Sequence, residues 1–231
     1  MSSGTLYIVS TPIGNLKDIT YRAVEILSSV DLILCEDTRR TKVLCREYGI
    51  NVPLKSYYNY VEESRTEEIL PLLFEGKNVA LVSDSGTPGI SDPGYLIIRK
   101  CVDNKIKVVP VPGPTAFVSA VVCSGLPLNK ILFLGFLPRK TGQIEKIFQK
   151  YFLDDITLVF YESPYRIKKT LEVLRTIFKE AEVYCVLGRE LTKVYEEFIK
   201  GKIKEIYDKI KDITFKGEVV GILYRGKYYE S

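Results

Sequence analysis

Short apolar runs that alternate with longer helical patterns are the feature that most restricts the fold of this chain. Val, Ile and Leu dominate four runs of five or six residues, with little polarity inside them. Continuous apolar runs of this length suit strands covered on both faces, as in parallel sheets. The alternation therefore predicts an α/β fold with a mostly parallel sheet. The expected strands are Thr5–Ser10, Asp31–Glu36, Asn78–Ser83 and Lys107–Val111, and the expected helices between them are Tyr21–Ser29, Arg39–Tyr48 and Glu62–Phe74.

Capping residues refine the expected starts of three helices. Thr20 is a suitable N-cap for the first helix. Asp92 followed by Pro93 predicts a further helix with Pro93 at its first position, because proline suits the first helical turn. Ser163 followed by Pro164 predicts a helix start in the second half for the same reason.

The second half of the chain has a different rhythm. Several of its apolar runs follow one another closely enough to pair antiparallel, which predicts a mixed sheet. We therefore expect two α/β domains, residues 1–113 with the mostly parallel sheet and residues 114–231 with the mixed one. The expected strands of the second domain are Leu132–Gly135, Thr157–Tyr161, Val183–Gly188, Glu196–Ile199 and Glu218–Tyr224.

The residue inventory argues against several kinds of chemistry. The chain has no His, and its five Cys form no C-x-x-C pair. Neither a zinc site nor a histidine base is therefore expected, and the thiols suit buried positions in a reducing compartment. No signal peptide is recognisable, and no apolar run reaches the roughly 18–20 residues that span a bilayer. The sequence predicts a cytoplasmic protein without a metal site and without membrane contact.

The charge of the chain is unevenly distributed. The net charge is +4 for 231 residues, but residues 1–112 contain 13 Lys+Arg against 14 Asp+Glu, which leaves 20 against 15 for residues 113–231. A basic second half suits a polyanionic substrate. A solvated, lysine-rich surface explains the same numbers, and on the charge alone it is the favoured interpretation.

Polar and glycine-rich segments follow the predicted strands. In open α/β sheets ligands bind at the carboxyl ends of strands, so these segments are the candidate site. The most unusual one contains two Asp, three Gly and two Pro within twelve residues, and such a loop is stiff and lets its backbone approach a ligand. The segments are Ser10–Leu16, Ser83–Gly94, Val111–Ala116, Phe136–Lys140, Tyr161–Pro164 and Arg189–Lys193.

These segments, in this order, resemble the tetrapyrrole methylase superfamily of S-adenosylmethionine enzymes, and within it the ribosomal RNA branch. Eight stretches in register carry the resemblance, and together they span residues 5 to about 200. They are T-P-I-G-N-L-K-D-I-T (11–20), C-E-D-T-R-R-T (35–41), S-D-S-G-T-P-G-I-S-D-P-G (83–94), V-P-G-P-T-A (111–116), S-G-L-P (124–127), G-F-L-P-R-K (135–140), F-Y-E-S-P-Y-R-I (160–167) and G-R-E-L-T-K-V-Y-E-E (188–197).

The resemblance implies a two-domain fold with S-adenosylmethionine in the cleft between the domains, usually in a homodimer. The implied activity is 2′-O-methylation of a cytidine ribose in the decoding region of small-subunit ribosomal RNA, on the RNA or on the assembled subunit. Family residues differ at three positions, with Ala common where Ser85 stands, Ser where Thr115 stands and His where Tyr165 stands. The cofactor contacts of the family map onto Pro12, Gly14, Asp84, Ser85, Gly86, Thr87, Pro88, Ile90, Thr115, Ala116, Tyr161, Glu190 and Leu191.

A ribose hydroxyl is a poor nucleophile, so a base or a nearby cation is expected in the site. Glu162 is the preferred candidate for the base, with Lys140 or Arg189 as the cation. The weaker candidates are Glu36, Asp37, Glu190 and Lys193. RNA binding is expected from the cations Arg39, Arg40, Lys42, Arg139, Lys140, Arg166, Lys168 and Lys169 and from the aromatic faces of Tyr57, Tyr58 and Tyr60.

Two other functions fit the same residues. A methyltransferase that acts on a small tetrapyrrole precursor would also favour a basic cleft, because its substrates are acidic. A non-catalytic RNA-binding module that kept the fold is the third interpretation. The ribosomal-type stretches favour RNA over a tetrapyrrole, and the intact loop at residues 83–90 argues against a module that lost its cofactor.

Overall fold

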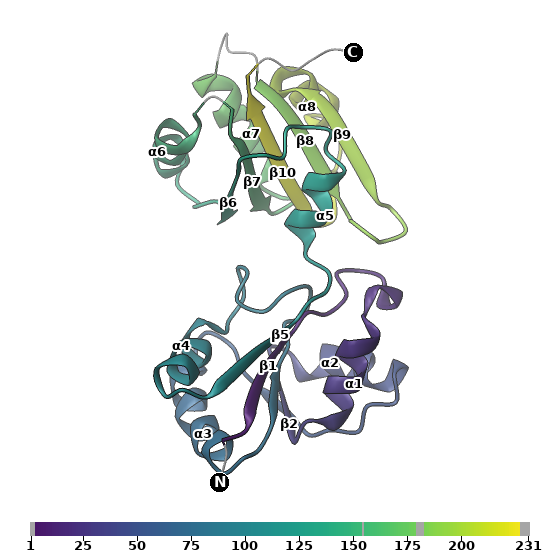
Figure 1. The fold of residues 1–231 in the computed structure, drawn as a ribbon. Coiled ribbons are helices and arrows are strands. Elements are labelled where there is room, and N and C mark those ends of the chain that lie inside the picture. Colours follow the sequence, from purple (N-terminus) through teal and green to yellow (C-terminus); the bar gives the residue numbers. More distant parts are fainter. Residues whose placement is uncertain (1–2, 154, 179–182, 227–231) are drawn as a thin grey trace. The chain divides into compact units, whose positions relative to one another are not determined.

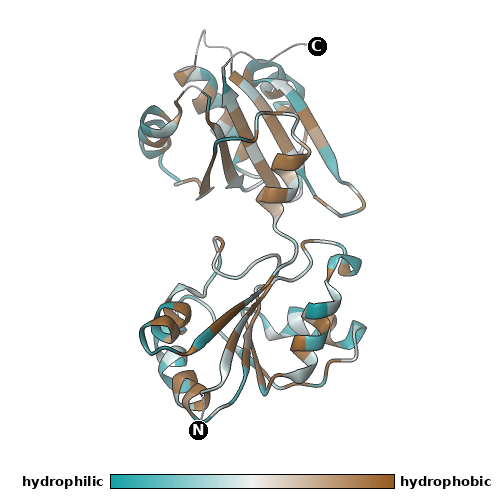
Figure 2. Cartoon of the chain, viewed as in Figure 1, coloured by the Kyte–Doolittle hydropathy of each residue, from teal (hydrophilic) through white to brown (hydrophobic). Residues whose placement is uncertain are grey.

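The computed structural model describes residues 3–153, 155–178 and 183–226. The chain divides into two compact units, Met1–Thr115 and Ala116–Ser231, each with a sheet and a hydrophobic core of its own (Figure 1). Apolar residues concentrate on the strands of both sheets (Figure 2).

The first unit contains a sheet of five parallel strands in the order β3-β2-β4-β1-β5. The four predicted strands are confirmed. The short edge strand β3 is not anticipated by the apolar pattern, because all three of its residues are only half-buried. The strands are β1 (Thr5–Val9), β2 (Leu32–Cys35), β3 (Leu54–Ser56), β4 (Val79–Leu81) and β5 (Lys107–Val111).

Four α-helices cover the two faces of this sheet. Helices α1 and α2 pack on one face through Leu27 and Leu44, and α3 and α4 pack on the other through Ile69 and Ile97 (Figure 1). Right-handed crossovers impose this division, because the chain moves in one direction from β1 to β3 and in the opposite direction from β3 to β5. Full burial of each such side chain stabilises the fold by about 1.5–3 kcal/mol. The helices are η1 (Leu16–Asp18, one 3-10 turn), α1 (Tyr21–Ser29), α2 (Thr38–Glu47), α3 (Glu62–Phe74) and α4 (Tyr95–Asp103).

The start of α4 differs from its prediction. The N-cap is Gly94, with φ of 143°, and neither Asp92 nor Pro93 belongs to the helix. The carboxylate that serves the helix start comes from α3, since Glu62 Oε1 accepts hydrogen bonds from the N–H groups of Gly94 and Leu96, both at 3.1 Å. A cap supplied from 32 residues away leaves no local sequence signal. The predicted cap of α1 is confirmed, because the side chain of Thr20 accepts a hydrogen bond from the third helical residue.

The second unit contains a mixed sheet in the order β6-β7-β10-β8-β9, in which only β6 and β7 are parallel. The core between this sheet and α6, α7 and α8 is apolar, and α5 packs against β7 and β10. All five predicted strands are confirmed, whereas α6 and α8 are additional. The elements are α5 (Ala116–Val122), β6 (Ile131–Phe136), α6 (Thr141–Tyr151), β7 (Thr157–Glu162), α7 (Ile167–Ile177), β8 (Val183–Arg189), β9 (Glu197–Lys202), α8 (Ile203–Ile210) and β10 (Val219–Arg225).

Helix α7 begins three residues later than the Ser-Pro signal predicts. Ser163 and Pro164 form a turn, and the N-cap is Arg166. The carbonyl of Ser163 accepts the N–H groups of Arg166 at 2.9 Å and Ile167 at 3.0 Å, so the turn leads into the helix without belonging to it. A capping pattern does not distinguish such a turn from the first helical turn. Among the helices of the described residues, none is both long enough and apolar enough to cross a membrane.

Candidate functional site

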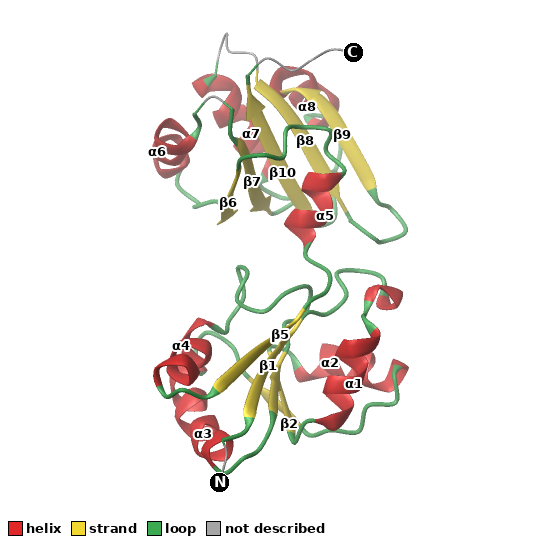
Figure 3. Cartoon of the chain, viewed as in Figure 1, coloured by secondary structure: helices red, strands yellow, loops and turns green. Residues whose placement is uncertain are grey.

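The carboxyl ends of the first sheet bring together three segments that the sequence singled out. Strands β1 and β4 are neighbours, but the chain leaves β1 toward the face of α1 and leaves β4 toward the face of α4 (Figure 3). Open parallel sheets bind ligands at such a reversal. The loops that meet here are Ser10–Leu16, Ser83–Gly94 and residues 112–115.

Two of these loops are joined by a small antiparallel bridge. The N–H of Thr11 donates to the carbonyl of Gly86 at 2.8 Å, and the N–H of Gly86 donates back to Thr11 at 3.1 Å. The hydroxyl of Thr11 donates to the carbonyl of Ser83 at 3.1 Å. Gly86 has φ of +90°, a conformation that strains any residue with a side chain. The turn after β4 is therefore held rigidly against the end of β1.

A chain of hydroxyl groups extends this connection to the end of β5. Ser10 Oγ lies 2.8 Å from Thr87 Oγ1, which lies 2.7 Å from Thr115 Oγ1. Thr87 also donates to the carbonyl of Pro114 at 3.2 Å. A Cβ on Gly113 would lie 2.9 Å from Ser10 Cβ, so only glycine permits this approach. The sequence predicts Thr87 and Thr115 as cofactor contacts, whereas it places Ser10 only within the candidate segment Ser10–Leu16.

Carboxylates surround the turn after β4. Asp84 Oδ1 accepts a hydrogen bond from the N–H of Asp37 at 2.9 Å, and Arg40 lies 3.6 Å from Asp84. Burial, and then the charge of Asp84, raise the pKa of Glu36. Burial, and then the charge of Glu36, raise the pKa of Asp92 to about 6. This acidic zone suits a ligand that donates hydrogen bonds from ribose hydroxyl or ammonium groups.

A pocket of about 90 Å³ lies between these loops and α2. Pro12 and Asp84, two of the predicted cofactor contacts, line it together with Arg40. The structure thus brings Pro12, Asp84, Gly86, Thr87 and Thr115 into one strand-end region. Of the other predicted contacts in the first unit, Gly14 is exposed, Ser85 and Ile90 are half-buried and Pro88 is buried. The remaining ones, Ala116, Tyr161, Glu190 and Leu191, belong to the second unit.

Glu162 is a buried carboxylate at the end of β7 in the second unit. Its Oε1 accepts the N–H of Ser163 at 2.8 Å, and its Oε2 accepts the hydroxyl of Thr170 at 2.7 Å. Arg166 Nη2 lies 3.2 Å from the same Oε2. The side chain of Glu162 has no exposed surface. An enclosed carboxylate with both oxygens engaged suits a positioning group better than the general base that sequence reasoning predicted.

Arg166 connects Glu162 to the loop that follows β6. Its Nη2 donates to the carbonyls of Leu137 at 2.9 Å and Pro138 at 2.7 Å. The next two residues of this loop, Arg139 and Lys140, are exposed. Both are predicted RNA contacts, and Lys140 is also a predicted catalytic cation. The predicted RNA contact Arg166 is instead occupied in holding their loop.

The segment after β8 carries further predicted residues. Arg189 Nη2 forms an ion pair with Glu197 at 2.8 Å. Glu190 has φ of 50°, and its Oε1 accepts hydrogen bonds from Lys193 Nζ and from the N–H of Glu218, both at 2.9 Å. The carboxylate of Glu190 therefore holds a strained turn in place.

An aromatic cluster surrounds the predicted cofactor contact Tyr161. Its hydroxyl accepts the N–H of Phe117 at 3.2 Å, near the start of α5. The ring of Tyr161 packs edge-on against Phe133 with centroids 4.9 Å apart, and Phe133 stacks on Phe117 at 4.4 Å. Leu191, another predicted contact, is 7% exposed. These contacts fix the start of α5 against β6 and β7.

The predicted RNA contacts of the first unit differ in their surroundings. Arg39 forms an ion pair with Asp37 at 2.7 Å, and this partner lowers the pKa of Asp37 to about 2. Arg40 faces Asp84. Lys42 has no ion pair among the described residues. Arg39 and Arg40 thus each face a carboxylate, whereas Lys42 faces none within the described residues.

Only two of the three tyrosines predicted as stacking faces are accessible. Tyr58 and Tyr60 are exposed, whereas Tyr57 is 1% exposed. The hydroxyl of Tyr57 donates to Glu62 at 3.2 Å and lies 2.9 Å from the hydroxyl of Thr66. The prediction for Tyr57 is wrong because β3 directs this ring into the core beside α3.

Comparison with known proteins decides the family. Residues 5–207 match the family described as Tetrapyrrole (Corrin/Porphyrin) Methylases. The chain is a tetrapyrrole methylase by family. A methylase of this family transfers a methyl group from a donor.

Relatives with high identity carry one name. A protein named ribosomal RNA small subunit methyltransferase I from Hydrogenobaculum sp. (strain Y04AAS1) is 46% identical over 221 residues, which cover 94% of each chain. A protein of the same name from Thermotoga maritima is 46% identical over 220 residues, covering 95% of this methylase and 98% of the relative. The superfamily and the methyltransferase class predicted from the sequence are therefore confirmed.

A solved structure confirms the fold. The uroporphyrin III C-methyl transferase from Thermus thermophilus superimposes with a TM-score of 0.63 over 96% of this methylase and 97% of that chain, at 16% identity. The predicted α/β fold with a parallel and a mixed sheet is the fold of the family. At this identity the likeness concerns the fold alone.

Proposed function

We propose that this methylase transfers the methyl group of S-adenosylmethionine to the 2′-oxygen of a cytidine in the decoding region of small-subunit ribosomal RNA. The 46% identity to proteins named for small-subunit ribosomal RNA methylation, over almost the full length of both chains, carries this proposal. The RNA branch, rather than a small tetrapyrrole substrate, is also favoured by the ribosomal-type stretches at residues 11–20, 35–41 and 160–167.

The strand-end region fits the proposed cofactor. S-adenosylmethionine offers ribose hydroxyls and an ammonium group as hydrogen-bond donors, and the carboxylates of Asp84 and Glu36 accept such bonds. Thr87 and Thr115 are half-buried hydroxyls beside the left-handed turn of Gly86, where the backbone can approach a ligand closely. The hydrogen bonds among the three loops hold these groups in place before a ligand arrives, which lowers the entropy that binding costs.

The chemistry of the reaction is an in-line displacement. When bound, the cofactor supplies a methyl carbon activated by a sulfonium. The ribose 2′-oxygen forms a bond to this carbon while the carbon–sulfur bond breaks, and the hydroxyl proton leaves to a base or to water. The contribution of the protein is orientation, which can be worth about 7–11 kcal/mol in favourable cases. We propose that Lys140 and Arg189 stabilise the developing alkoxide and that Glu162 acts through Arg166.

Substrate recognition follows from the RNA backbone. Arg39, Arg40, Arg139 and Lys140 are exposed or half-exposed cations that suit phosphate contacts. A ribosomal substrate makes the cytoplasm the place of action. A homodimer, as the resemblance implies, is part of the same proposal.

The test is methylation of small ribosomal subunits that lack the modification. The protein is incubated with labelled S-adenosylmethionine and either subunits or protein-free small-subunit RNA, and the RNA is digested to nucleosides. The expected product is 2′-O-methylcytidine. Label on a base contradicts the proposed position. A parallel incubation with a porphyrin precursor tests the small-molecule alternative, which label on the precursor but not on RNA would support. Calorimetry with S-adenosylmethionine alone tests the cofactor independently, and no uptake would refute it.

A further inference from the structure

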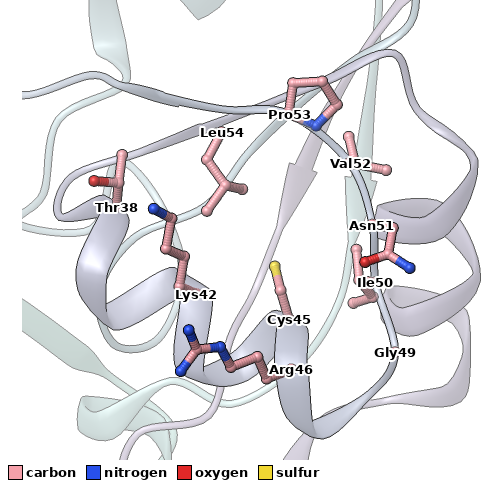
Figure 4. Close-up of a pocket in the computed structure, with 10 residues that line it drawn as sticks. All are labelled: Thr38, Lys42, Cys45, Arg46, Gly49, Ile50, Asn51, Val52, Pro53 and Leu54. Carbon is pink, nitrogen blue, oxygen red and sulfur yellow. The ribbon is translucent and has the colours of Figure 1, made fainter.

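A groove separate from the strand-end region runs along α2. It has a volume of about 920 Å³ and lies between α2 and the segment that leads into β3 (Figure 4). Figure 4 shows side chains of α2 on one side of it and residues 51–54 on the other. We call it the α2–β3 groove, and it is lined by Thr38, Lys42, Cys45, Arg46, Gly49, Ile50, Asn51, Val52, Pro53 and Leu54.

The α2–β3 groove has an uncompensated positive charge. Lys42 and Arg46 are its only charged lining residues, and neither forms an ion pair within the described part of the chain. The neighbouring Arg39 and Arg40 both face carboxylates. Like charges four residues apart on a helix repel each other, so the fold gains nothing from this pair. A ligand with negative charges would gain from both.

The remaining lining suits the other parts of a nucleotide. Val52 and Leu54 offer half-buried apolar surface, and proline at position 53 adds an exposed ring. The side chains of the lining residues Thr38 and Asn51 form no hydrogen bond within the described residues, so they are available as donors and acceptors (Figure 4). Apolar surfaces, amides and cations together are what single-stranded RNA requires, because bases pack on apolar faces and phosphates on cations. A volume near 920 Å³ accommodates more than one nucleotide.

The α2–β3 groove lies across α2 from the strand-end region. Thr38, which lines the groove, directly follows Asp37, whose N–H donates to Asp84. On the other side of α2, Arg40 and Thr41 line the pocket that contains Pro12 and Asp84. An RNA strand whose reacting nucleotide lies near the strand-end region would reach the groove by passing the start of α2, at Asp37 and Thr38.

We propose that the α2–β3 groove binds a single-stranded stretch of the RNA substrate that flanks the methylated nucleotide, with Lys42 and Arg46 on its phosphates. This inference rests on the proposed function and extends it from the reacting nucleotide to the path of the strand. It adds Arg46, Thr38 and Asn51 to the RNA contacts that the sequence predicted.

The test compares two variants with the same change in charge. In K42A/R46A both groove cations are removed, and in K100A/K107A two exposed lysines of α4 and β5 are removed instead. Binding of a fluorescein-labelled, mixed-sequence 12-nucleotide RNA is measured by anisotropy between 50 and 400 mM salt. For single strands the slope of log affinity against log salt is about −0.7 per phosphate contact. K42A/R46A should therefore make the slope shallower by about 1.4, equivalent to about 25-fold weaker binding at 0.1 M salt. K100A/K107A should leave the slope and the affinity nearly unchanged.

Two further measurements make the outcome decisive. Calorimetric uptake of S-adenosylmethionine and the melting temperature should be the same in both variants and the wild type, which excludes misfolding. Ultraviolet cross-linking of 4-thiouridine RNA should label the peptide that contains residues 38–54. Equal salt slopes for both variants, or cross-links confined to other peptides, would overturn RNA binding in the α2–β3 groove. Either result would leave the proposed methylation of subunits untouched. If the wild type itself does not methylate RNA, that result would instead contradict the proposed function.

Discussion

Replacement of Asp92 by Asn should stabilise this methylase at neutral pH. Asp92 is half-buried in the acidic zone after β4, where burial and the charge of Glu36 raise its pKa to about 6 from an ordinary value of 3.8. A raised pKa means that the folded state favours the protonated carboxyl. The ionised form therefore destabilises the fold, and the asparagine side chain, which resembles the neutral carboxyl, removes this cost.

The magnitude follows from the two pKa values. One pKa unit corresponds to about 1.36 kcal/mol, so the difference between 3.8 and about 6 corresponds to about 3 kcal/mol above pH 6. Partial exposure of Asp92 screens the charge and reduces the expected gain to about 1–2 kcal/mol. The sign depends on pH. The cost is absent below pH 3.8, grows as the pH rises toward 6, and is constant above it.

The assay is urea unfolding followed by circular dichroism at pH 7.5 and pH 4.0. The free energy of unfolding of D92N should exceed that of the wild type by about 1–2 kcal/mol at pH 7.5 and by close to zero at pH 4.0. D103N provides the control, because Asp103 is exposed on α4 and, among the described residues, forms an ion pair with Arg99 alone, at 3.0 Å. Its free energy of unfolding should stay within about 0.5 kcal/mol of the wild type. A variant D92N that is less stable than the wild type at both pH values would refute the reasoning, since the carboxylate would then be stabilising.

Two further substitutions test the contacts of the separate units. T87V removes the hydroxyl that links Ser10 and Thr115 while keeping the side-chain volume. The calorimetric affinity for S-adenosylmethionine should fall about tenfold, as expected for the loss of about 1–1.5 kcal/mol per hydrogen bond. T176V, on the exposed face of α7, should leave this affinity unchanged. R166A leaves the buried carboxylate of Glu162 without its cation. Urea unfolding should show a free energy of unfolding lower by about 3 kcal/mol. A loss below about 1 kcal/mol would show that the Glu162 carboxylate is not buried as described.

The sequence predicts the first sheet well because its signals are local. β5 and the helices α1 and α3 begin and end at the predicted residues, since their apolar patterns and flanking turns are contained within a few positions. The edge strand β3 lacks such a signal because it has only three residues, and two of them, Lys55 and Ser56, are polar. The start of α4 was missed because its cap is supplied by Glu62 from another helix.

The candidate site shows the same division between local and distant information. The glycine-rich turn after β4 is recognisable from its composition, but the bridge between Thr11 and Gly86 joins residues 75 positions apart. The roles of Ser10 and Asp92 depend on which loops the sheet brings together, and no spacing in the sequence encodes that. The resemblance to a family supplied positions for the cofactor contacts, and the structure adds the hydrogen bonds that hold them.

The network around Glu162 gives a physical reason why two separate stretches of the sequence belong together. Glu162 and Arg166 lie in one stretch, and Leu137, Pro138 and Lys140 lie in the other. The carboxylate holds the guanidinium by an ion pair, and the guanidinium holds the two carbonyls, so the loop that presents Lys140 is fixed by a charge buried in the core. Removal of charge from Glu162 should therefore loosen this loop. A variant of Glu162 without its charge should accordingly bind RNA more weakly and also react more slowly. Loss of a base would slow the chemical step alone.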